Sequence, residues 1–399
     1  MKAIRLAAFA AAVAFAAPIL AASSLAALAR ALPPPDNFLF WTPAQQRVGY
    51  RNIEKIFPIR VIKRGKHVMA LPRAARQLRI RYDYNGIHWD TARFMDANRV
   101  AGLMVVHHGK IVLERYGLGE TAQDRWTSFS VGKSFTSTLV GAAIKDGYIK
   151  SLDAPVTDYL PGLKGSAYDG VTIRELLTMS SGVKWNENYA DPNSDVNRFA
   201  QGAVTANGED PVVAYMARLK REATPGTRFE YKTGESELIG MLVISATHMH
   251  LADYLSQKIW QTVGMQRDGV WMIDRGGNEM GGCCISMTLG DYARFGLFVM
   301  HGGMADAKQI LPKDWVKEAS TTQIQSDWGK WGYGFQWWIV PGGGAYEAIG
   351  IFGQSIYINP KKDLVIVTNS AWPEADNDPY YASHDAFVAA AVEALHKSK

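Results

Sequence analysis

Cysteine is almost absent from the chain, which holds 2 among 399 residues. The two are neighbours, Cys283 and Cys284, and a disulfide between adjacent residues is a strained arrangement. The sequence therefore predicts no disulfide framework. Both cysteines are interpreted as small buried side chains.

Several signatures of specialised sites are missing as well. The sequence has no H-E-x-x-H and no Cys/His cluster, so we expect no metal ion and no organic cofactor. It has no G-x-S-x-G, the motif that carries the nucleophile of α/β-hydrolases, so that class of serine hydrolase is excluded. Gly132-Lys133-Ser134 looks like the end of a phosphate-binding loop, but Thr127 stands where that loop needs glycine. The net charge of +5 is mild and no basic-aromatic pattern occurs, so no nucleic-acid partner is expected.

Charge is absent from Leu6 to Ala29, directly after a short basic start. This Ala-rich run ends in Ala27-Leu28-Ala29 and resembles a secretory signal with its cleavage site. The run is also long enough to span a bilayer. Residues 1–30 are therefore a signal peptide or an N-terminal membrane anchor. Either way we expect export: to the periplasm, to the periplasmic side of the inner membrane, or into the medium where no outer membrane exists.

Acidic residues are absent from Lys55 to Tyr82. Residues 31–88 contain Pro33-Pro34-Pro35 near their start. We interpret this stretch as a linker followed by a basic lead-in. Contact with anionic lipid or cell-wall polymer is one explanation of the basic stretch. A solvated irregular face is the favoured alternative, because the charges form no helical stripe.

Apolar patterns predict strands near both ends of the remaining chain and helices between them. The sequence thus predicts an α/β (α+β) fold, with an antiparallel sheet flanked by helices, built from both chain ends, and an inserted all-helical domain. Residues 89–128 and 265–399 form the expected sheet domain, and 129–264 the mainly helical one. The expected strands are 101–107, 111–116, 331–340, 346–349, 354–358 and 364–368, and the expected helices include 211–222, 235–264 and 384–397.

The most informative motif is S-x-x-K, formed by Ser130 and Lys133 at the start of a predicted helix that ends at Gly147. Residues i and i+3 share a helix face, so Lys133 can reach the Ser130 hydroxyl. A lysine whose pKa is lowered by burial can take the proton of a serine nucleophile. A second S-x-x-K at 181–184 contains Gly182 and precedes no helix, so we interpret it as a loop.

Three segments, 128–136, 153–163 and 172–182, resemble the class C β-lactamase-like serine hydrolases. That superfamily includes class C β-lactamases, DD-peptidases, family VIII-type esterases and 6-aminohexanoate-dimer hydrolases. The resemblance covers roughly residues 95–395 and implies a β-lactamase/DD-peptidase-like fold with an acyl-enzyme on Ser130.

The superfamily's second motif is a tyrosine followed two residues later by Asn, Ser or Thr. Tyr231-Lys232-Thr233 matches it. The resemblance implies that Tyr231 shares proton transfer with Lys133 and that Thr233 holds Lys133 by a hydrogen bond.

The third motif carries a lysine or histidine in β-lactamases and DD-peptidases, and here that residue is missing. Gly350-Ile351-Phe352-Gly353-Gln354 stands in its place and is similar to the 6-aminohexanoate-dimer hydrolase branch. The resemblance implies that Gly350 and Gly353 support the site, and that the backbone N–H groups of Ser130 and Ile351 form the oxyanion hole. Tyr189 matches a loop tyrosine that contacts the substrate amide in that branch. A lid or surface role for Tyr189 is the alternative.

The sequence therefore predicts an exported serine hydrolase that cleaves an amide or ester of a small substrate. A β-lactamase or DD-peptidase of the same fold is one alternative, and a non-catalytic cell-wall or ligand-binding protein is another. Membrane attachment, if present, would use residues 6–29. The oligomeric state stays open.

Overall fold

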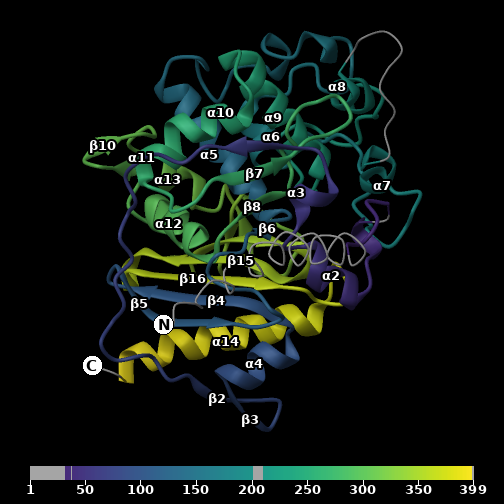
Figure 1. Ribbon diagram of the computed structural model, residues 1–399. Helices are drawn as coiled ribbons and strands as arrows, with labels where there is room; N and C mark the ends of the chain where they lie inside the picture. Colours follow the sequence, from purple (N-terminus) through teal and green to yellow (C-terminus); the bar gives the residue numbers. More distant parts are fainter. Residues whose placement is uncertain (1–31, 37, 201–209, 398–399) are drawn as a thin grey trace, which may run out of the picture.

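The computed structural model describes residues 32–36, 38–200 and 210–397 (Figure 1). The predicted signal peptide or anchor at residues 1–30 lies outside them. A central antiparallel sheet divides the fold into layers, with most helices on one side of it.

The main sheet joins the two ends of the chain, as the sequence predicts. Its order is β11-β12-β13-β14-β15-β16-β4-β5. The pair that joins the two ends, β16 and β4, is antiparallel and runs from Leu364 opposite His107 to Ser370 opposite Val100. The strands are β4 (Val100–His107), β5 (Lys110–Tyr116), β11 (Ile324–Gln325), β12 (Gly332–Tyr333), β13 (Trp338–Ile339), β14 (Tyr346–Gly350), β15 (Gln354–Asn359) and β16 (Leu364–Ser370).

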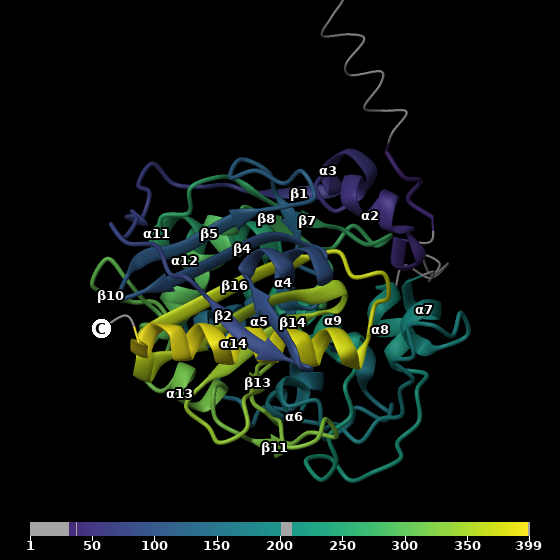
Figure 2. The same ribbon diagram turned by 90° about the horizontal axis from the view of Figure 1, so that it is seen from below.

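Both faces of this sheet are buried, which explains why β4 from Val100 to Val106 and β16 from Leu364 to Val367 are apolar at successive positions. In β4, Met104 and Val106 face the core under α5 and α12, whereas Leu103 and Val105 face the core under α14. Figures 1 and 2 show α14 and α4 on one side and α5 and α12 on the other. These helices are α4 (Thr91–Ala97), α5 (Val131–Lys145), α12 (Leu289–Met300) and α14 (Asp378–Lys397).

A small second sheet, ordered β1-β7-β8-β6, lies between the main sheet and the helical region. Its first strand comes from the basic lead-in, where Arg60 pairs with Glu279 at 3.0 Å. The sequence predicts domain boundaries at 128/129 and 264/265. Both boundaries lie near strands of this sheet, and the division into domains stays a prediction. The strands are β1 (Ile59–Ile62), β6 (Trp126–Thr127), β7 (Gly269–Met272) and β8 (Ile285–Met287).

Residues 38–50, which lie in the stretch 31–88 predicted as a linker and basic lead-in, pack against the body of the protein. This segment carries α2 (Pro43–Gly49), and Trp41 and Tyr50 are buried in an aromatic cluster with Trp126 and Phe129. Burying such large rings removes much apolar surface from water, which fixes the segment against the body of the protein.

The middle of the chain is mainly helical, but its helices are shorter than the sequence pattern predicts. The expected helix 235–264 breaks at His248, whose left-handed backbone (φ 57°) ends α9. The helices are α6 (Ile173–Leu177), α7 (Asp195–Ala200), α8 (Pro211–Met216), α9 (Thr233–Thr247), α10 (Leu251–Leu255), a π turn (Ser256–Trp260) and α11 (Gln261–Val263).

The predicted strand 331–340 is also interrupted, because Gln336 takes a left-handed backbone (φ 61°) between β12 and β13. The remaining elements are short. They are α3 (Ile53–Ile56), β2 (Arg81–Tyr84), β3 (Ile87–Asp90), β9 (Met304–Ala305), β10 (Lys308–Gln309), α13 (Trp315–Ala319) and 3₁₀ turns at Phe38–Phe40, Val156–Asp158, Pro161–Leu163, Ile351–Gly353 and Pro360–Lys362.

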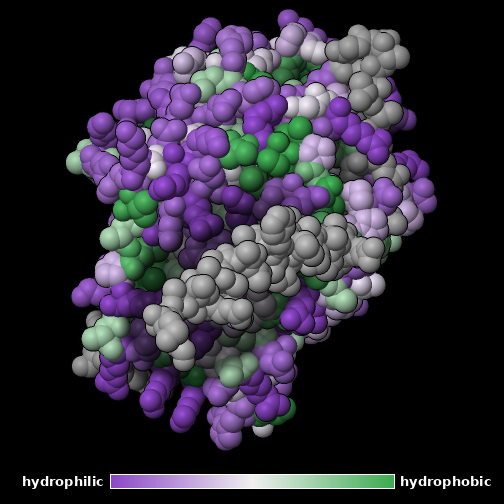
Figure 3. All heavy atoms as spheres, in the orientation of Figure 1, coloured by the Kyte–Doolittle hydropathy of each residue, from purple (hydrophilic) through white to green (hydrophobic). Residues whose placement is uncertain are grey.

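Among the described residues no single helix is long and apolar enough to cross a bilayer. The pair Thr233–Thr247 and Leu251–Val263 has the length and composition but bends by 76°. Many of its apolar side chains belong to the buried core. The face in Figure 3 is mostly hydrophilic, with hydrophobic residues in a few small patches.

Candidate active site

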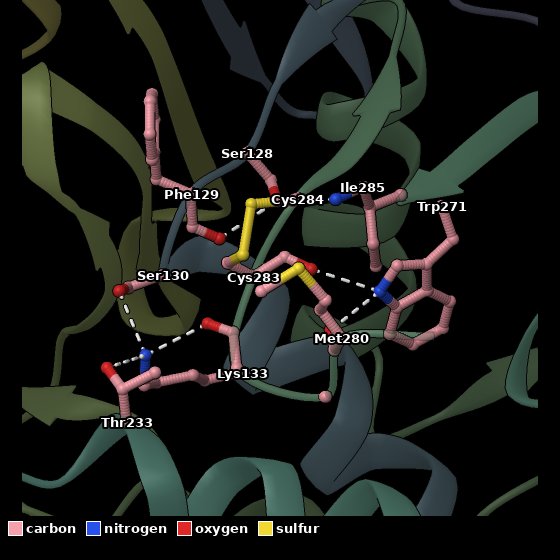
Figure 4. The surroundings of a disulfide bond; sticks show 12 residues. Ser128, Phe129, Ser130, Lys133, Thr233, Trp271, Met280, Cys283, Cys284 and Ile285 are labelled. Atoms are coloured by element: carbon pink, nitrogen blue, oxygen red, sulfur yellow. Dashed lines mark hydrogen bonds between the residues drawn. A yellow bond between two sulfur atoms is a disulfide. The ribbon is translucent and has the colours of Figure 1, made fainter. Parts of the chain in front are cut away.

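Ser130 lies at the N-terminus of α5, where the chain turns sharply from β6 into the helix. Phe129 makes this turn with a left-handed backbone (φ 43°). The Ser128 hydroxyl braces it by accepting the Ile285 N–H at 3.0 Å and donating to the Phe129 carbonyl at 2.9 Å (Figure 4). Ser130 is held at the base of this turn and is only 7% exposed.

Lys133 lies one turn along the same helix and contacts three oxygen atoms from three parts of the chain. Its Nζ donates to Ser130 Oγ at 3.0 Å, to Thr233 Oγ1 at 3.0 Å and to the Gly282 carbonyl at 2.9 Å (Figure 4). Burial lowers the pKa of Lys133 to about 8, against the opposing charges of Glu187 and Glu237. The amine can therefore lose and regain a proton near neutral pH.

Tyr231 lies over Lys133, whose Nζ is 5.1 Å from the centre of the tyrosine ring. Its ring stacks on Trp338 with centroids 5.7 Å apart. Burial raises the pKa of Tyr231, Glu187 raises it further, and the hydrogen bond with Ser130 opposes both. Tyr231 is therefore a neutral phenol beside the serine hydroxyl, able to donate or relay a proton.

Gly350 ends β14 against the backbone of the Ser130 turn. A Cβ at this position would lie 2.7 Å from the Ser128 carbonyl oxygen and 3.1 Å from the Ser130 nitrogen. Only glycine permits such an approach. Ile351 follows directly, so the two N–H groups predicted to form the oxyanion hole come from segments in close contact.

The rest of the G-x-x-G-Q motif holds this turn in place. Gly353 has a left-handed backbone (φ 86°), and a Cβ there would collide with the Trp372 ring at 2.3 Å. Gln354 is buried; its amide donates to the Ile351 carbonyl at 3.3 Å and its oxygen accepts from Trp126 Nε1 at 3.0 Å. The motif thus forms a tightly packed corner between β14 and β15.

Tyr189 also belongs to this region, on the loop before α7. It packs on the cluster that contains Phe129 and Ile351, and its hydroxyl donates to Glu187 Oε1 at 2.6 Å. The structure therefore links Lys133 directly to Ser130 and to Thr233, and links Tyr189 to Thr233 through Glu187. Their chemical roles stay a prediction.

The fold and the site can now be compared with known proteins. The Beta-lactamase family model matches residues 91–390. The chain belongs to that family. It is 31% identical over 286 residues to a 6-aminohexanoate-dimer hydrolase of Paenarthrobacter ureafaciens, covering 68% of this chain and 73% of the relative.

Solved structures agree with this membership of the Beta-lactamase family. A Bacillus anthracis protein, provisionally named a 6-aminohexanoate-dimer hydrolase, has a TM-score of 0.78 and 25% identity, covering 92% of this chain and 99% of its own. A family VIII carboxylesterase has a TM-score of 0.59 and 17% identity, covering 76% and 95% of the two chains. At that identity the second similarity shows the fold alone.

Within this family fold, sequence reasoning missed two carboxylates beside Lys133. Glu187 lies in the loop that carries Tyr189, and Glu237 lies one turn into α9. Burial raises the pKa of Glu237 to about 8, while Lys133 and the N–H groups of Gly282 and Gly281 oppose that rise. An acidic residue four positions after Thr233 was the only available signal for Glu237.

The prediction of two separate cysteines is wrong. Cys283 and Cys284 form a disulfide, directly after the Gly282 carbonyl that accepts from Lys133 (Figure 4). Cys284 has a left-handed backbone (φ 73°), an irregular conformation that the sequence pattern did not indicate. Cys284 is buried, as expected.

One group in the described part of the chain has the residue types of a metal site: Glu347, His384 and Asp385, whose ligand atoms lie within 4.8 Å of one another. His384 Nε2 already contacts Glu347 at 2.9 Å and lies 3.4 Å from Ser355 Oγ. These contacts link α14 to the sheet, and we interpret the group as a structural ion pair.

Proposed function

We propose that this protein is a serine hydrolase that cleaves an amide or ester bond of a small substrate through an acyl-enzyme on Ser130. The observation that carries the proposal is the 3.0 Å contact between Ser130 Oγ and the buried Lys133 amine. Membership of the Beta-lactamase family and the 6-aminohexanoate-dimer hydrolase relative support the same reaction class.

The first half-reaction forms the acyl-enzyme. Ser130 Oγ attacks the substrate carbonyl and its proton passes to neutral Lys133, with Tyr231 as the relay. The N–H groups of Ser130 and Ile351 stabilise the oxyanion. The intermediate then collapses, the bond to the leaving amine or alcohol breaks, and that group departs with the proton.

The second half-reaction is hydrolysis. Water attacks the Ser130 ester and gives its proton to the same Lys133–Tyr231 pair. The carboxylic acid leaves, and Ser130 Oγ recovers its proton. Each cycle consumes one water and leaves the protein unchanged.

The third motif favours an amide or simple ester over a β-lactam. The segment Gly350-Ile351-Phe352-Gly353-Gln354 stands where β-lactamases and DD-peptidases carry a lysine or histidine for the substrate carboxylate. The close contact of Gly350 with the Ser130 turn leaves no room for a side chain at position 350.

Intact mass after reaction with a fluorophosphonate tests the proposal, with a penicillin in a parallel arm. We expect one phosphonyl group on the wild type, none on Ser130→Ala, and one on the control Ser151→Ala, whose serine is exposed. If the folded wild type is not labelled, the enzyme proposal is contradicted and a non-catalytic binding protein is favoured. A Ser130-dependent penicillin adduct or turnover would move the protein to the β-lactam branch.

We also propose that the protein is exported, on the strength of the uncharged run at residues 6–29. Fractionation of the expressing cell and N-terminal sequencing test this. A mature N-terminus near residue 30 in the soluble exported fraction indicates cleavage, and an intact N-terminus in the membrane fraction indicates an anchor. Cytoplasmic protein with an intact N-terminus would contradict export.

A further inference from the structure

Glu187 joins two residues of the family motifs, Thr233 and Tyr189, although the motifs assign it no role of its own. Its Oε1 accepts from the Tyr189 hydroxyl at 2.6 Å and from the Thr233 hydroxyl. Its Oε2 accepts from the Thr233 backbone N–H at 2.9 Å and from Trp185 Nε1. A carboxylate offers about four acceptor positions, so all of them have partners.

This arrangement fixes the direction of one hydrogen bond to the general base. The Thr233 hydroxyl has a single proton, and it points to Glu187. Its lone pairs therefore face Lys133, whose Nζ donates to it at 3.0 Å. Because the hydrogen bond from Lys133 to Thr233 has a fixed direction, Lys133 keeps its orientation toward Ser130.

The charge of Glu187 acts on both proton-transfer groups. It is the foremost of the two carboxylates that oppose the burial-driven fall in the pKa of Lys133; the other is Glu237 from α9. It also raises the pKa of Tyr231, together with Asp376, while Ser130 lowers it. Glu187 thus favours the Lys133 cation and the neutral phenol.

The same carboxylate reaches the substrate side of the site. Burial raises the pKa of Tyr189, and Glu187 and Tyr231 raise it further, so its hydroxyl stays protonated and can donate. It donates to Glu187, which fixes the position of its ring beside Phe129 and Ile351. Lys133 and Tyr189 are therefore joined through one acceptor.

We propose that Glu187 is a positioning residue that couples the Lys133 base to Tyr189 and sets the pH at which the base becomes active. This inference rests on the proposed hydrolase function. The competing explanation is a purely structural anchor, since the Thr233 N–H belongs to the N-terminus of α9, where a carboxylate stabilises the helix.

Glu187→Gln separates the two explanations. The amide keeps one acceptor oxygen but turns an NH₂ group toward two donors, and it removes the charge. The pKa of Lys133 should fall, because its cation loses a counter-charge. The neutral base then exists at lower pH, while the orientation of Thr233 and Tyr189 is disturbed.

The first measurement is kcat/KM against pH for a p-nitrophenyl ester. We expect the wild-type rate to rise through about pH 8, because burial lowers the pKa of Lys133 to about 8. In Glu187→Gln the rise should move down by about half a pH unit or more, and kcat should fall about tenfold or more. Glu222→Gln, a surface carboxylate paired with Lys184 and Arg228, is the matched control and should change neither. Tyr189→Phe should change KM but leave the pH of the rise in place.

The second measurement does not need activity: ¹³C NMR titration of the Lys133 ε-carbon, assigned with Lys133→Ala. A lower Lys133 pKa in Glu187→Gln, with wild-type values in Glu187→Asp and Glu222→Gln, supports the proposal. An unchanged Lys133 pKa and an unchanged pH profile in folded Glu187→Gln overturn it. If wild type fails to react with the fluorophosphonate, the hydrolase proposal falls, and the NMR titration still decides whether Glu187 sets the proton on Lys133.

Discussion

At the residue scale, the side chain that defines the site is Lys133. It has three oxygen acceptors, each from a different segment: α5, α9 and the loop before β8. A cation with three good acceptors would normally stay protonated, yet burial lowers the pKa of Lys133 to about 8. The opposition between hydrogen bonding and desolvation keeps the amine usable as a base.

Lys133→Ala should therefore lower kcat/KM by about 10³-fold or more, because the serine loses its proton acceptor. The control is Lys184→Ala in the second S-x-x-K, whose side chain is exposed and pairs with Glu222 at 3.1 Å. That variant should stay within about twofold of wild type. Esterase kinetics on both variants check this. Equal losses in the two would show that Lys133 is not the base.

At the element scale, the corner between β14 and β15 and the loop 281–284 enclose the Ser130 turn. The β14–β15 corner can lie against the turn because Gly350 has no side chain. The loop contacts the same region through the Gly282 carbonyl, which accepts a hydrogen bond from Lys133.

Gly350→Ala should displace the oxyanion donors, because its Cβ would meet the Ser130 nitrogen at 3.1 Å. We expect kcat to fall about 10²-fold with a small change in KM. Gly109→Ala, at the open hairpin turn of β4 and β5 (φ 67°), is the control: it should strain the backbone and spare kcat. If both variants keep wild-type kcat, the corner does not form the oxyanion hole.

The Cys283–Cys284 disulfide should be detectable in denatured, unreduced protein as the absence of alkylation, with two alkyl groups added after reduction with a phosphine. Because the disulfide adjoins the Gly282 carbonyl that accepts from Lys133, reduction of the folded protein should slow fluorophosphonate labelling of Ser130. The Cys283→Ser/Cys284→Ser double variant should label slowly with or without phosphine. Two alkylated thiols before reduction would refute the disulfide.

At the scale of the whole molecule, α14 closes the sheet face opposite the active site and depends on a buried ion pair. His384 Nε2 lies 2.9 Å from Glu347 of β14, and both residues are buried. Burial lowers the pKa of His384, but Glu347 outweighs burial and the net shift is upward. The carboxylate thus favours the protonated form of the His384 imidazole.

This pair should make stability depend on pH. A raised folded-state pKa gives stabilisation that is complete below the unfolded value of 6.5 and is lost as the pH rises through the folded value. His384→Asn should therefore lose more stability at pH 6 than at pH 8.5, by urea unfolding, with a loss of about 3 kcal/mol at the lower pH. Exposed His88, changed to Asn, should show no such difference. Equal losses for His384→Asn at both pH values would show that the imidazole is not charged.

Much of the fold was predictable because it follows from local pattern. The 101–116 hairpin, the helix after Ser130 and the pairing of strands from both ends all appear as expected. The predicted helix 235–264 and strand 331–340 failed at His248 and Gln336, each of which takes a left-handed backbone. Periodicity carries no information about such single residues.

The family, the sheet built from both ends and four candidate site residues could be predicted from the chain alone, because short motifs and local apolar patterns carry this information. The four residues are Ser130, Lys133, Tyr231 and Thr233. Only the tertiary structure revealed the Glu187 junction, the Gly282 carbonyl, the Cys283–Cys284 disulfide and the buried aromatic segment at residues 38–50. These features join segments far apart in the chain, or depend on the backbone conformation of single residues. Their geometry is fixed by packing and hydrogen bonding in the folded state, which linear spacing does not encode.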